Sequence, residues 1–148
     1  MLSTFEQILK DQGVLVYTIK GVSMFPLLRQ HRDLICVLPH EGRLKRYDVP
    51  LFKRDNGEYV VHRVLKVLPD GYGISGDNQS FIEFVREDQI IGIVDKIERN
   101  GKTIPLRSTP EHPVVPLKYR IYTHLWCDFF PVRAFFVKVE FRLRRWFK

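Results

Sequence analysis

The sequence predicts a mainly β protein, with a short helix before the strands and a helical appendage after them. Between residues 14 and 105, short runs rich in Val, Ile, Leu and Tyr alternate with Gly, Pro, Asn and Asp turns. The N-terminal residues carry a helix-capping pattern, and the C-terminal residues place apolar side chains at helical spacing. A chain of 148 residues can bury one core without disulfides or metals.

The N-terminal residues predict a helix at about residues 4–12. Ser3 and Glu6 have the spacing of a capping box, in which each side chain accepts a hydrogen bond from a free backbone N–H. Apolar residues then follow on one helical face, and Gly13 suits the position after the last turn.

Six runs have the composition of strands, and two of the turns between them indicate hairpins. Asp55-Asn56-Gly57 separates the third run from the fourth, and Asn100-Gly101, a strong type I′ signal, separates the last two. The six runs cover residues 14–19, 33–38, 49–54, 58–68, 89–98 and 102–106.

Four prolines follow the last run and mark an irregular linker: Pro105, Pro110, Pro113 and Pro116. We therefore divide the chain into a β-domain at residues 1–105, a linker at 106–116 and a tail at 117–148.

The tail carries most of the charge of the protein. Its eight basic and two acidic residues account for +6 of the net +7, and it holds ten of the 19 aromatic residues. Residues 137–143 alternate apolar and charged side chains as a strand would, but a helical stripe covers more residues and Pro131 suits a helix start. The stripe contains Val132, Phe135, Phe136, Val139, Leu143, Trp146 and Phe147.

A basic, aromatic-rich amphipathic tail suits two roles. It can lie in the interface of an anionic membrane, or it can pack its aromatic side chains onto the β-domain. Nucleic acid is not an expected partner, because no nucleic-acid motif accompanies the charge and the rest of the chain is nearly neutral.

The sequence also argues against metal-binding, secreted and membrane-spanning proteins. Cys36 and Cys127 are far apart and form no Cys-x-x-Cys pattern, so we expect neither a metal site nor any cofactor. The N-terminus lacks the features of a secretory signal, and no run approaches the 18 or so apolar residues of a membrane span. We therefore expect a cytoplasmic protein, with the tail as its one means of peripheral membrane contact.

The first candidate for chemistry is Ser23, in the sequence Gly-Val-Ser-Met-Phe-Pro at residues 21–26. Gly21 permits an unusual backbone angle and Pro26 fixes the exit, so the turn can present Ser23 at the end of a strand. Backbone N–H groups near Met24 are then free to bind a developing oxyanion. A serine beside a glycine is equally at home in a plain turn.

Two further candidates complete a catalytic pattern. A serine needs a base to take its proton, and His62 is the one histidine inside a strongly β-patterned run. Asp77 follows 15 residues later, in Gly-Asp-Asn, and a carboxylate there can orient the imidazole. Read separately, His62 is an ordinary strand histidine and Gly-Asp-Asn an ordinary turn.

The order of these segments resembles the type I signal peptidase family. The likeness covers residues 14–98 and includes GVSMFPLLRQHRDLICV, YDVPLFKR, VVHRVLKV, GYGISGDNQS and IIGIVDKI. It implies a strongly bent sheet or partly closed β-barrel. Bacterial members and the related self-cleaving repressors use a lysine as base, so His62 resembles the archaeal and endoplasmic-reticulum branch. The resemblance implies that Ser23 is the nucleophile, His62 the base and Asp77 the third member.

The sequence departs from that family in three ways. The acidic pair expected after Gly-Asp-Asn is reduced to Glu83, so the third member stays open between Asp77 and Glu83. The glycine expected before Asp33 is replaced, giving His31-Arg32-Asp33. No transmembrane anchor precedes the serine segment, which argues against bulk preprotein processing.

We therefore expect a serine endopeptidase that cleaves a leader, signal or precursor peptide. The alternative is a non-catalytic peptide-binding or regulatory module that keeps the fold. A self-cleaving repressor is disfavoured, because lysine is absent from the base position and no DNA-binding domain precedes residue 14.

Overall fold

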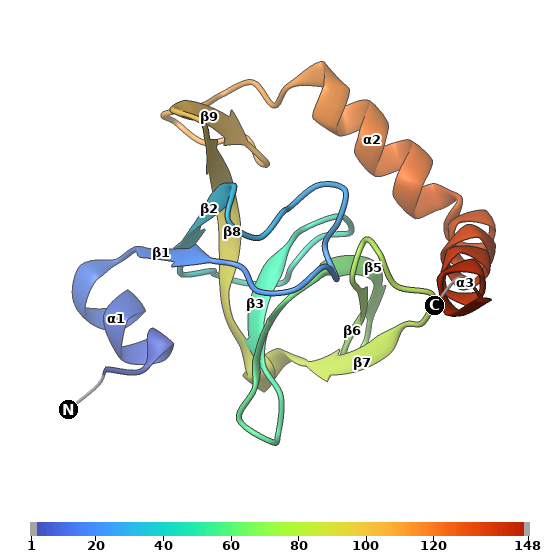
Figure 1. The fold of residues 1–148 in the computed structure, drawn as a ribbon. Helices are drawn as coiled ribbons and strands as arrows, with labels where there is room; N and C mark the ends of the chain where they lie inside the picture. The colour runs from blue at the N-terminus through green and yellow to red at the C-terminus, as the bar shows by residue number, and fades with distance from the viewer. Residues whose placement is uncertain (1–2, 147–148) are drawn as a thin grey trace.

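A computed structural model describes residues 3–146, apart from the side chains of residues 136 and 141, and it confirms the mainly β fold. Within that range, nine strands form a strongly curled, half-barrel arrangement, with α1 at one end and α2 and α3 at the other (Figure 1). The strongly bent sheet that we expected is therefore present.

The larger sheet has six strands and is antiparallel throughout. Its order is β1-β2-β8-β3-β4, with β9 paired to β8. The long strand β8 joins the sheet, because its first residues pair with β3 and its later residues with β2 and β9. Register shifts in β2 and β3 bend the sheet. The bounds are β1 Leu15–Thr18, β2 Asp33–Leu38, β3 Pro50–Lys53, β4 Tyr59–Val61, β8 Ile90–Arg99 and β9 Lys102–Pro105.

Both expected hairpins are present. The β3–β4 turn closes with a hydrogen bond from the Arg54 N–H to the Glu58 carbonyl at 2.8 Å, and Gly57 has φ 91°. Asn100 and Gly101, between β8 and β9, have φ 51° and 75°, the left-handed pair that a type I′ turn requires.

The smaller sheet contains β5, β6 and β7, at Arg63–Leu68, Gly71–Ser75 and Glu83–Arg86. The expectation of one strand over residues 58–68 is wrong, because that run changes sheet at His62. Val61 pairs with Leu51 in the larger sheet, whereas Arg63 pairs with Ser75 in the smaller one. Strands β6 and β7 are additional to the six runs that the sequence predicts.

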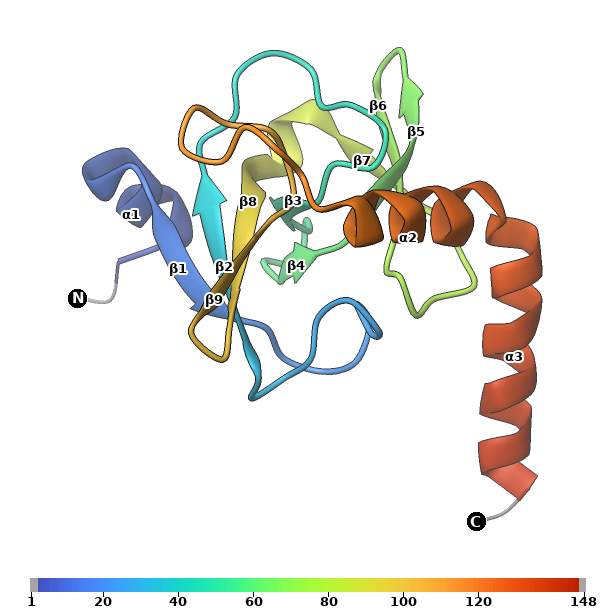
Figure 2. The ribbon, with the colours of Figure 1, turned by 90° about the horizontal axis from the view of Figure 1, so that it is seen from above.

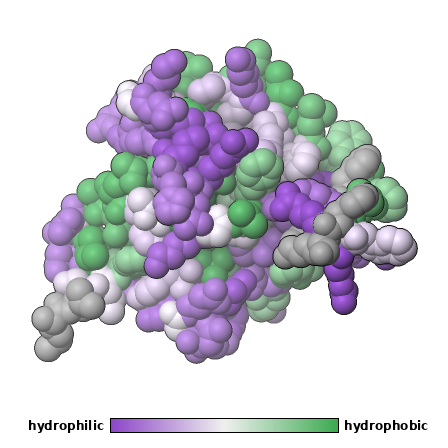
Figure 3. Space-filling view, in the orientation of Figure 1, coloured by the Kyte–Doolittle hydropathy of each residue, from purple (hydrophilic) through white to green (hydrophobic). Residues whose placement is uncertain are grey.

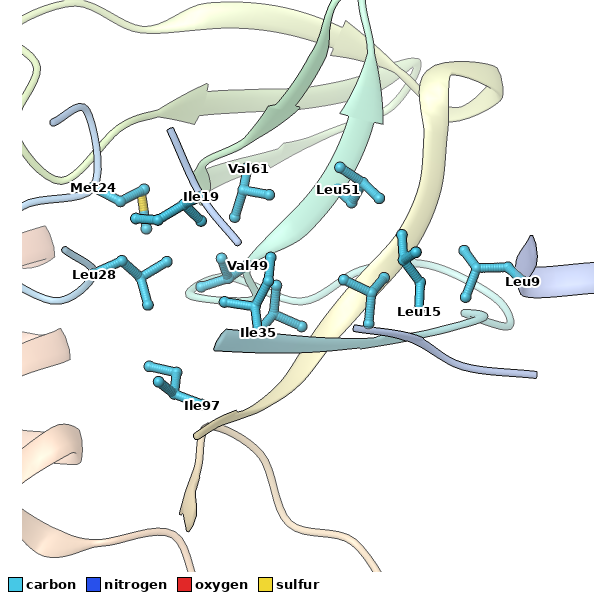
Figure 4. Close-up of a cluster of buried hydrophobic side chains, with 12 residues drawn as sticks. Leu9, Leu15, Ile19, Met24, Leu28, Ile35, Val49, Leu51, Val61 and Ile97 are labelled. Atoms are coloured by element: carbon cyan, nitrogen blue, oxygen red, sulfur yellow. The ribbon is translucent and has the colours of Figure 1, made fainter. Parts of the chain in front are cut away.

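The main core lies against the larger sheet (Figure 4). Ile35, Leu51 and Ile97 have no exposed surface. Met24 and Leu28, from the loop after β1, are part of the same cluster. Burying a side chain of this size contributes about 1.5–3 kcal/mol, so the core holds the loop that contains Ser23.

The N-terminal helix α1 spans Phe5–Gln12, as expected, but its cap is shifted by one residue. Thr4 is the N-cap and accepts a hydrogen bond from the Gln7 N–H, so the expected Ser3–Glu6 capping box is wrong. Glu6 instead accepts a hydrogen bond from the Tyr59 hydroxyl at 2.7 Å. Gly13 has φ 75° and ends the helix as expected.

The tail is helical, so a strand at residues 137–143 is excluded. Helix α2 covers Leu117–Asp128 and α3 covers Phe130–Trp146, while Phe147 of the expected stripe lies outside the described residues. Seen from above, α3 turns sharply at the end of α2 and leads away from the strands (Figure 2). None of the helices within residues 3–146 combines the length and the apolar content that crossing a bilayer requires.

Candidate active site

The candidate site begins in the loop between β1 and β2. Gly21 has φ 78°, which favours glycine, and its N–H donates to the Gln30 side chain at 3.0 Å. Ser23 is half-buried, and the Phe25–Pro26 peptide that follows it is cis.

The same loop is fixed where it enters β2. The buried Asp33 carboxylate accepts hydrogen bonds from Arg32, Arg99 and the Arg29 backbone N–H. His31, two residues before Asp33, takes the left-handed backbone angle, with φ 66°.

His62 lies beside Ser23. Its Nε2 atom is 3.1 Å from the Ser23 Oγ, and the residue is only 2% exposed. His62 occupies the break between β4 and β5, so the two sheets hold the backbone on both sides of it. A serine hydroxyl at hydrogen-bond distance from an imidazole nitrogen is the pairing that nucleophilic catalysis requires.

Glu83, at the start of β7, lies on the other side of the imidazole. Its Oε1 atom is 3.3 Å from His62 Nδ1, an ion-pair distance at which the ring N–H is not yet aligned for a hydrogen bond. Arg54 holds the same carboxylate through two hydrogen bonds, of 2.8 and 3.2 Å. Burial would raise the pKa of Glu83, but its contacts with His62 and Arg54 outweigh burial and lower that pKa to about 2. Glu83 is therefore a carboxylate at neutral pH.

Asp77 occupies a different place from the one first expected. Both of its carboxylate oxygens accept from the Arg63 guanidinium, at 2.8 and 2.9 Å, and one also accepts from the Tyr122 hydroxyl at 2.6 Å. Consecutive residues of an extended chain point to opposite sides, so Arg63 reaches Asp77 while His62 reaches Glu83. The assignment of Asp77 as the partner of His62 is corrected to Glu83, the stated alternative.

The Gly-Asp-Asn turn instead supports the Ser23 backbone. The Asn78 N–H donates to the Ser23 carbonyl at 2.9 Å, and the Asn78 side chain donates to the Val22 carbonyl at 3.1 Å. A Cβ atom at Gly76 would lie 2.5 Å from the Ser23 carbonyl oxygen. Gly76 is therefore required for this close approach of two backbone segments.

The tail helices hold that turn from the opposite side. The Trp126 indole N–H donates to the Asp77 carbonyl at 2.6 Å, in addition to the Tyr122 contact. Arg133, which is 3% exposed, donates to the Gly76 and Gln79 carbonyls. Burial and the neighbouring Asp77 raise the pKa of Tyr122 far above its usual range, so its hydroxyl remains a donor. Sequence reasoning missed all three residues, whose one visible signal was the unusual density of aromatic side chains in the tail.

The candidate oxyanion donors lie two and three residues after Gly21. Because the Gly21 N–H is taken by Gln30, it is not available to a substrate. Within residues 3–146, the backbone N–H groups of Ser23 and Met24 donate to no protein acceptor. The Met24 side chain is buried in the core, and Pro26 follows within the same turn. Free backbone N–H groups at a nucleophilic serine are candidates to stabilise a tetrahedral oxyanion.

A cleft of about 360 Å³ opens at Ser23 and His62. One wall comes from the end of β1 and the residues after it, including Tyr17 and Lys20, and the other comes from β4 and the residues flanking it. Such a cleft can hold an extended peptide beside a strand edge.

The described residues offer little for metal or thiol chemistry. No group of three or more His, Cys, Asp or Glu side chains within residues 3–146 is arranged to hold a metal ion. Burial raises the pKa of the Cys127 thiol to about 11, so it is protonated at neutral pH.

No protein-family model matches this chain, and no curated protein matches it. The family resemblance therefore remains a prediction from the residues themselves.

Proposed function

We propose that this chain is a serine endopeptidase, with Ser23 as nucleophile, His62 as general base and Glu83 as the residue that orients His62. The observation that carries the proposal is the 3.1 Å contact between Ser23 Oγ and His62 Nε2, with the Glu83 carboxylate beyond the ring. Acyl transfer by a serine uses a nucleophile, a base in contact with it and a carboxylate on the far side of that base.

The proposed reaction has two halves. His62 Nε2 takes the Ser23 proton as Oγ attacks a peptide carbonyl, and the Ser23 and Met24 N–H groups bind the oxyanion. His62 then gives its proton to the leaving amine, which leaves an ester on Ser23. Water, deprotonated by His62, attacks the ester and releases the acid. Glu83 stabilises the imidazolium in both halves. Its contact with Nδ1 shortens when substrate binds, as such hydrogen bonds do in other sites.

The proposed substrate is an extended segment of a leader, signal or precursor peptide. The cleft at Ser23 supports this choice, because it lies beside β4 and is open to a chain running along the strand. The proposed setting is the cytoplasm or a membrane surface.

The rival function is a non-catalytic peptide-binding module with the same fold. A distance between the Ser23 and His62 side chains too long for a hydrogen bond would favour this module. The observed contact instead favours catalysis, as do the low pKa of Glu83 and the two free N–H groups.

A peptide-library digest distinguishes the two functions. Purified protein is incubated with a mixture of peptides, and new termini are identified by mass spectrometry. Cleavage that is absent in Ser23→Ala and unchanged in Ser108→Ala, a serine of the linker, supports the peptidase. Peptide binding with no new termini at any pH favours the binding module. Peptides that accumulate in cells expressing Ser23→Ala then identify the natural substrate.

A further inference from the structure

The tail helices have two apolar faces, of which the β-domain covers one. The covered face includes Tyr119, Cys127 and Val137, which are 8%, 2% and 6% exposed. A surface helix of a globular protein needs one such face to pack on the core. The second face is therefore not explained by folding of this chain.

We call the second face the outer stripe. In α3, Val132, Val139 and Leu143 fall within about 40° of one another at 100° per residue, and Trp146 lies beside them. These four side chains are 53%, 36%, 53% and 84% exposed. In α2 the outer stripe consists of Leu117, Ile121 and Leu125, which are 66%, 48% and 58% exposed and four residues apart. Green, hydrophobic side chains mark the outer margin over α2 (Figure 3).

Basic side chains lie along one edge of the outer stripe. At 100° per residue, Arg142 falls about 40° from Trp146 on α3, and Lys138 and Arg145 lie farther round the helix on the same side; all three are exposed. On α2, exposed Lys118 is adjacent to Leu117.

The two acidic residues of the described tail are already paired with arginines. Glu140 accepts from Arg144 at 2.5 Å, and Asp128 pairs with Arg46 at 3.0 Å. Both acidic charges are therefore offset by arginines, in a tail that carries eight basic residues.

We propose that the outer stripe docks on an anionic lipid bilayer, with α2 and α3 lying in the interface. Apolar side chains enter the boundary of the acyl chains, while lysine and arginine at the edge meet the lipid phosphates and carboxylates. Charge complementarity selects this occupant. A second copy of the chain would bring two positive edges together, and a nucleic acid would leave the apolar side chains uncovered.

Docking places the candidate site at the membrane. The inner side of the same two helices contacts the turn at Gly76 and Asp77, which contacts the Ser23 backbone. The lipid contact itself does not rest on the proposed peptidase activity.

Vesicle co-flotation of the full chain tests the proposal. Vesicles of phosphatidylcholine alone are compared with vesicles that also contain phosphatidylserine. We expect binding to the anionic vesicles that weakens with added salt. Replacing Lys138, Arg142 and Arg145 by Gln together lowers affinity on the order of a hundredfold, since each basic residue near the surface is worth about fivefold. Leu143→Ser with Val139→Ser also lowers affinity.

Matched controls come from the β-domain. Val67→Ser replaces an exposed apolar residue outside the tail, and Lys10→Gln replaces an exposed basic one; both should leave vesicle binding unchanged. Fluorescence gives a second readout, because the protein has two tryptophans. A blue shift on vesicle binding should be lost in Trp146→Phe.

Three results would overturn the proposal. The first is no flotation with anionic vesicles. The second is self-association in sedimentation experiments that Leu143→Ser abolishes, which assigns the outer stripe to a second copy. The third is tight binding of a single-stranded oligonucleotide that needs the three basic residues but not Val139 or Leu143. Thermal melting of each variant checks that the fold is kept.

Discussion

The indole N–H of Trp126 donates to the backbone carbonyl of Asp77 at 2.6 Å, and this bond ties the tail to the turn beneath Ser23. Asn78, the next residue, donates to the Ser23 carbonyl at 2.9 Å. The position of the candidate nucleophile therefore depends on a helix that begins more than 90 residues after it. Trp126 and Tyr122 act through this turn as positioning residues.

Removing the Trp126 donor should slow acylation more than it weakens binding. Trp126→Phe keeps an aromatic side chain but removes the indole N–H, which leaves a buried carbonyl without its donor, at a cost of about 1–3 kcal/mol. We expect kcat to fall between about tenfold and a hundredfold, because small displacements of a nucleophile are costly, with KM nearly unchanged. Tyr122→Phe should act in the same direction.

Trp146→Phe, at an exposed position of α3, is the matched control and should leave kcat unchanged. A lower melting temperature for Trp126→Phe with an unaltered kcat would mean that the tail stabilises the fold without positioning Ser23.

Substitutions at Glu83 and Asp77 should differ in whether they mainly lower kcat or mainly lower the free energy of unfolding. Glu83→Gln removes the charge beside His62 Nδ1, at a side chain that is 24% exposed. We expect kcat to fall on the order of 10²–10⁴-fold, with a smaller loss in the free energy of unfolding than Asp77→Asn shows. Peptide hydrolysis and urea denaturation of the same samples measure the two effects.

Asp77→Asn should show the opposite balance. It leaves the fully buried Arg63 without its carboxylate, and breaking a buried ion pair costs about 3–5 kcal/mol. Wild-type stability in Asp77→Asn together with a greater loss of kcat than in Glu83→Gln would restore Asp77 as the catalytic carboxylate.

Much of the β-domain could be predicted because its signals are local. Strand composition located β2 and β8, and the left-handed residues of two hairpins were visible as Gly57 and Asn100-Gly101. The Ser23–His62 pair was also proposed from the sequence, and the structure brings the two side chains into contact.

The third member could not be chosen locally, because it depends on pairing between distant strands. Arg63 pairs with Ser75, and Ile74 pairs with Glu83, so two registers together bring Glu83 to His62. Periodicity within residues 58–68 gave no sign that the chain changes sheet at His62. The tail contacts at Asp77 were equally hidden, since helical patterning shows an apolar face but not what that face covers.

Acid should destabilise the protein in a defined pH range. Burial would raise the pKa of Asp33, but hydrogen bonds from Arg99 and Arg32 outweigh burial and lower it to about 2, and the pKa of Glu83 is also lowered to about 2. A carboxyl whose folded pKa is depressed stabilises the fold above its unfolded pKa. That stability is lost as pH falls through the folded value. We therefore expect the free energy of unfolding to fall between about pH 4.5 and pH 2.

Urea denaturation across this range measures the loss. Asp33→Asn should remove about 2 kcal/mol of stability at pH 7 and flatten the decline at low pH. The exposed Asp70→Asn is the matched control and should follow the wild type. A wild-type decline that survives unchanged in Asp33→Asn would refute the assignment of that stability to Asp33.

Covalent labelling of Ser23 by a fluorophosphonate tests the central claim most directly, because such probes react with serines that a neighbouring base activates. Intact mass and peptide mapping should show one adduct, on Ser23, with the labelling rate reduced at least a hundredfold in His62→Ala and unchanged in His124→Ala. An unlabelled Ser23 in folded protein, or equal labelling in His62→Ala, would contradict the account.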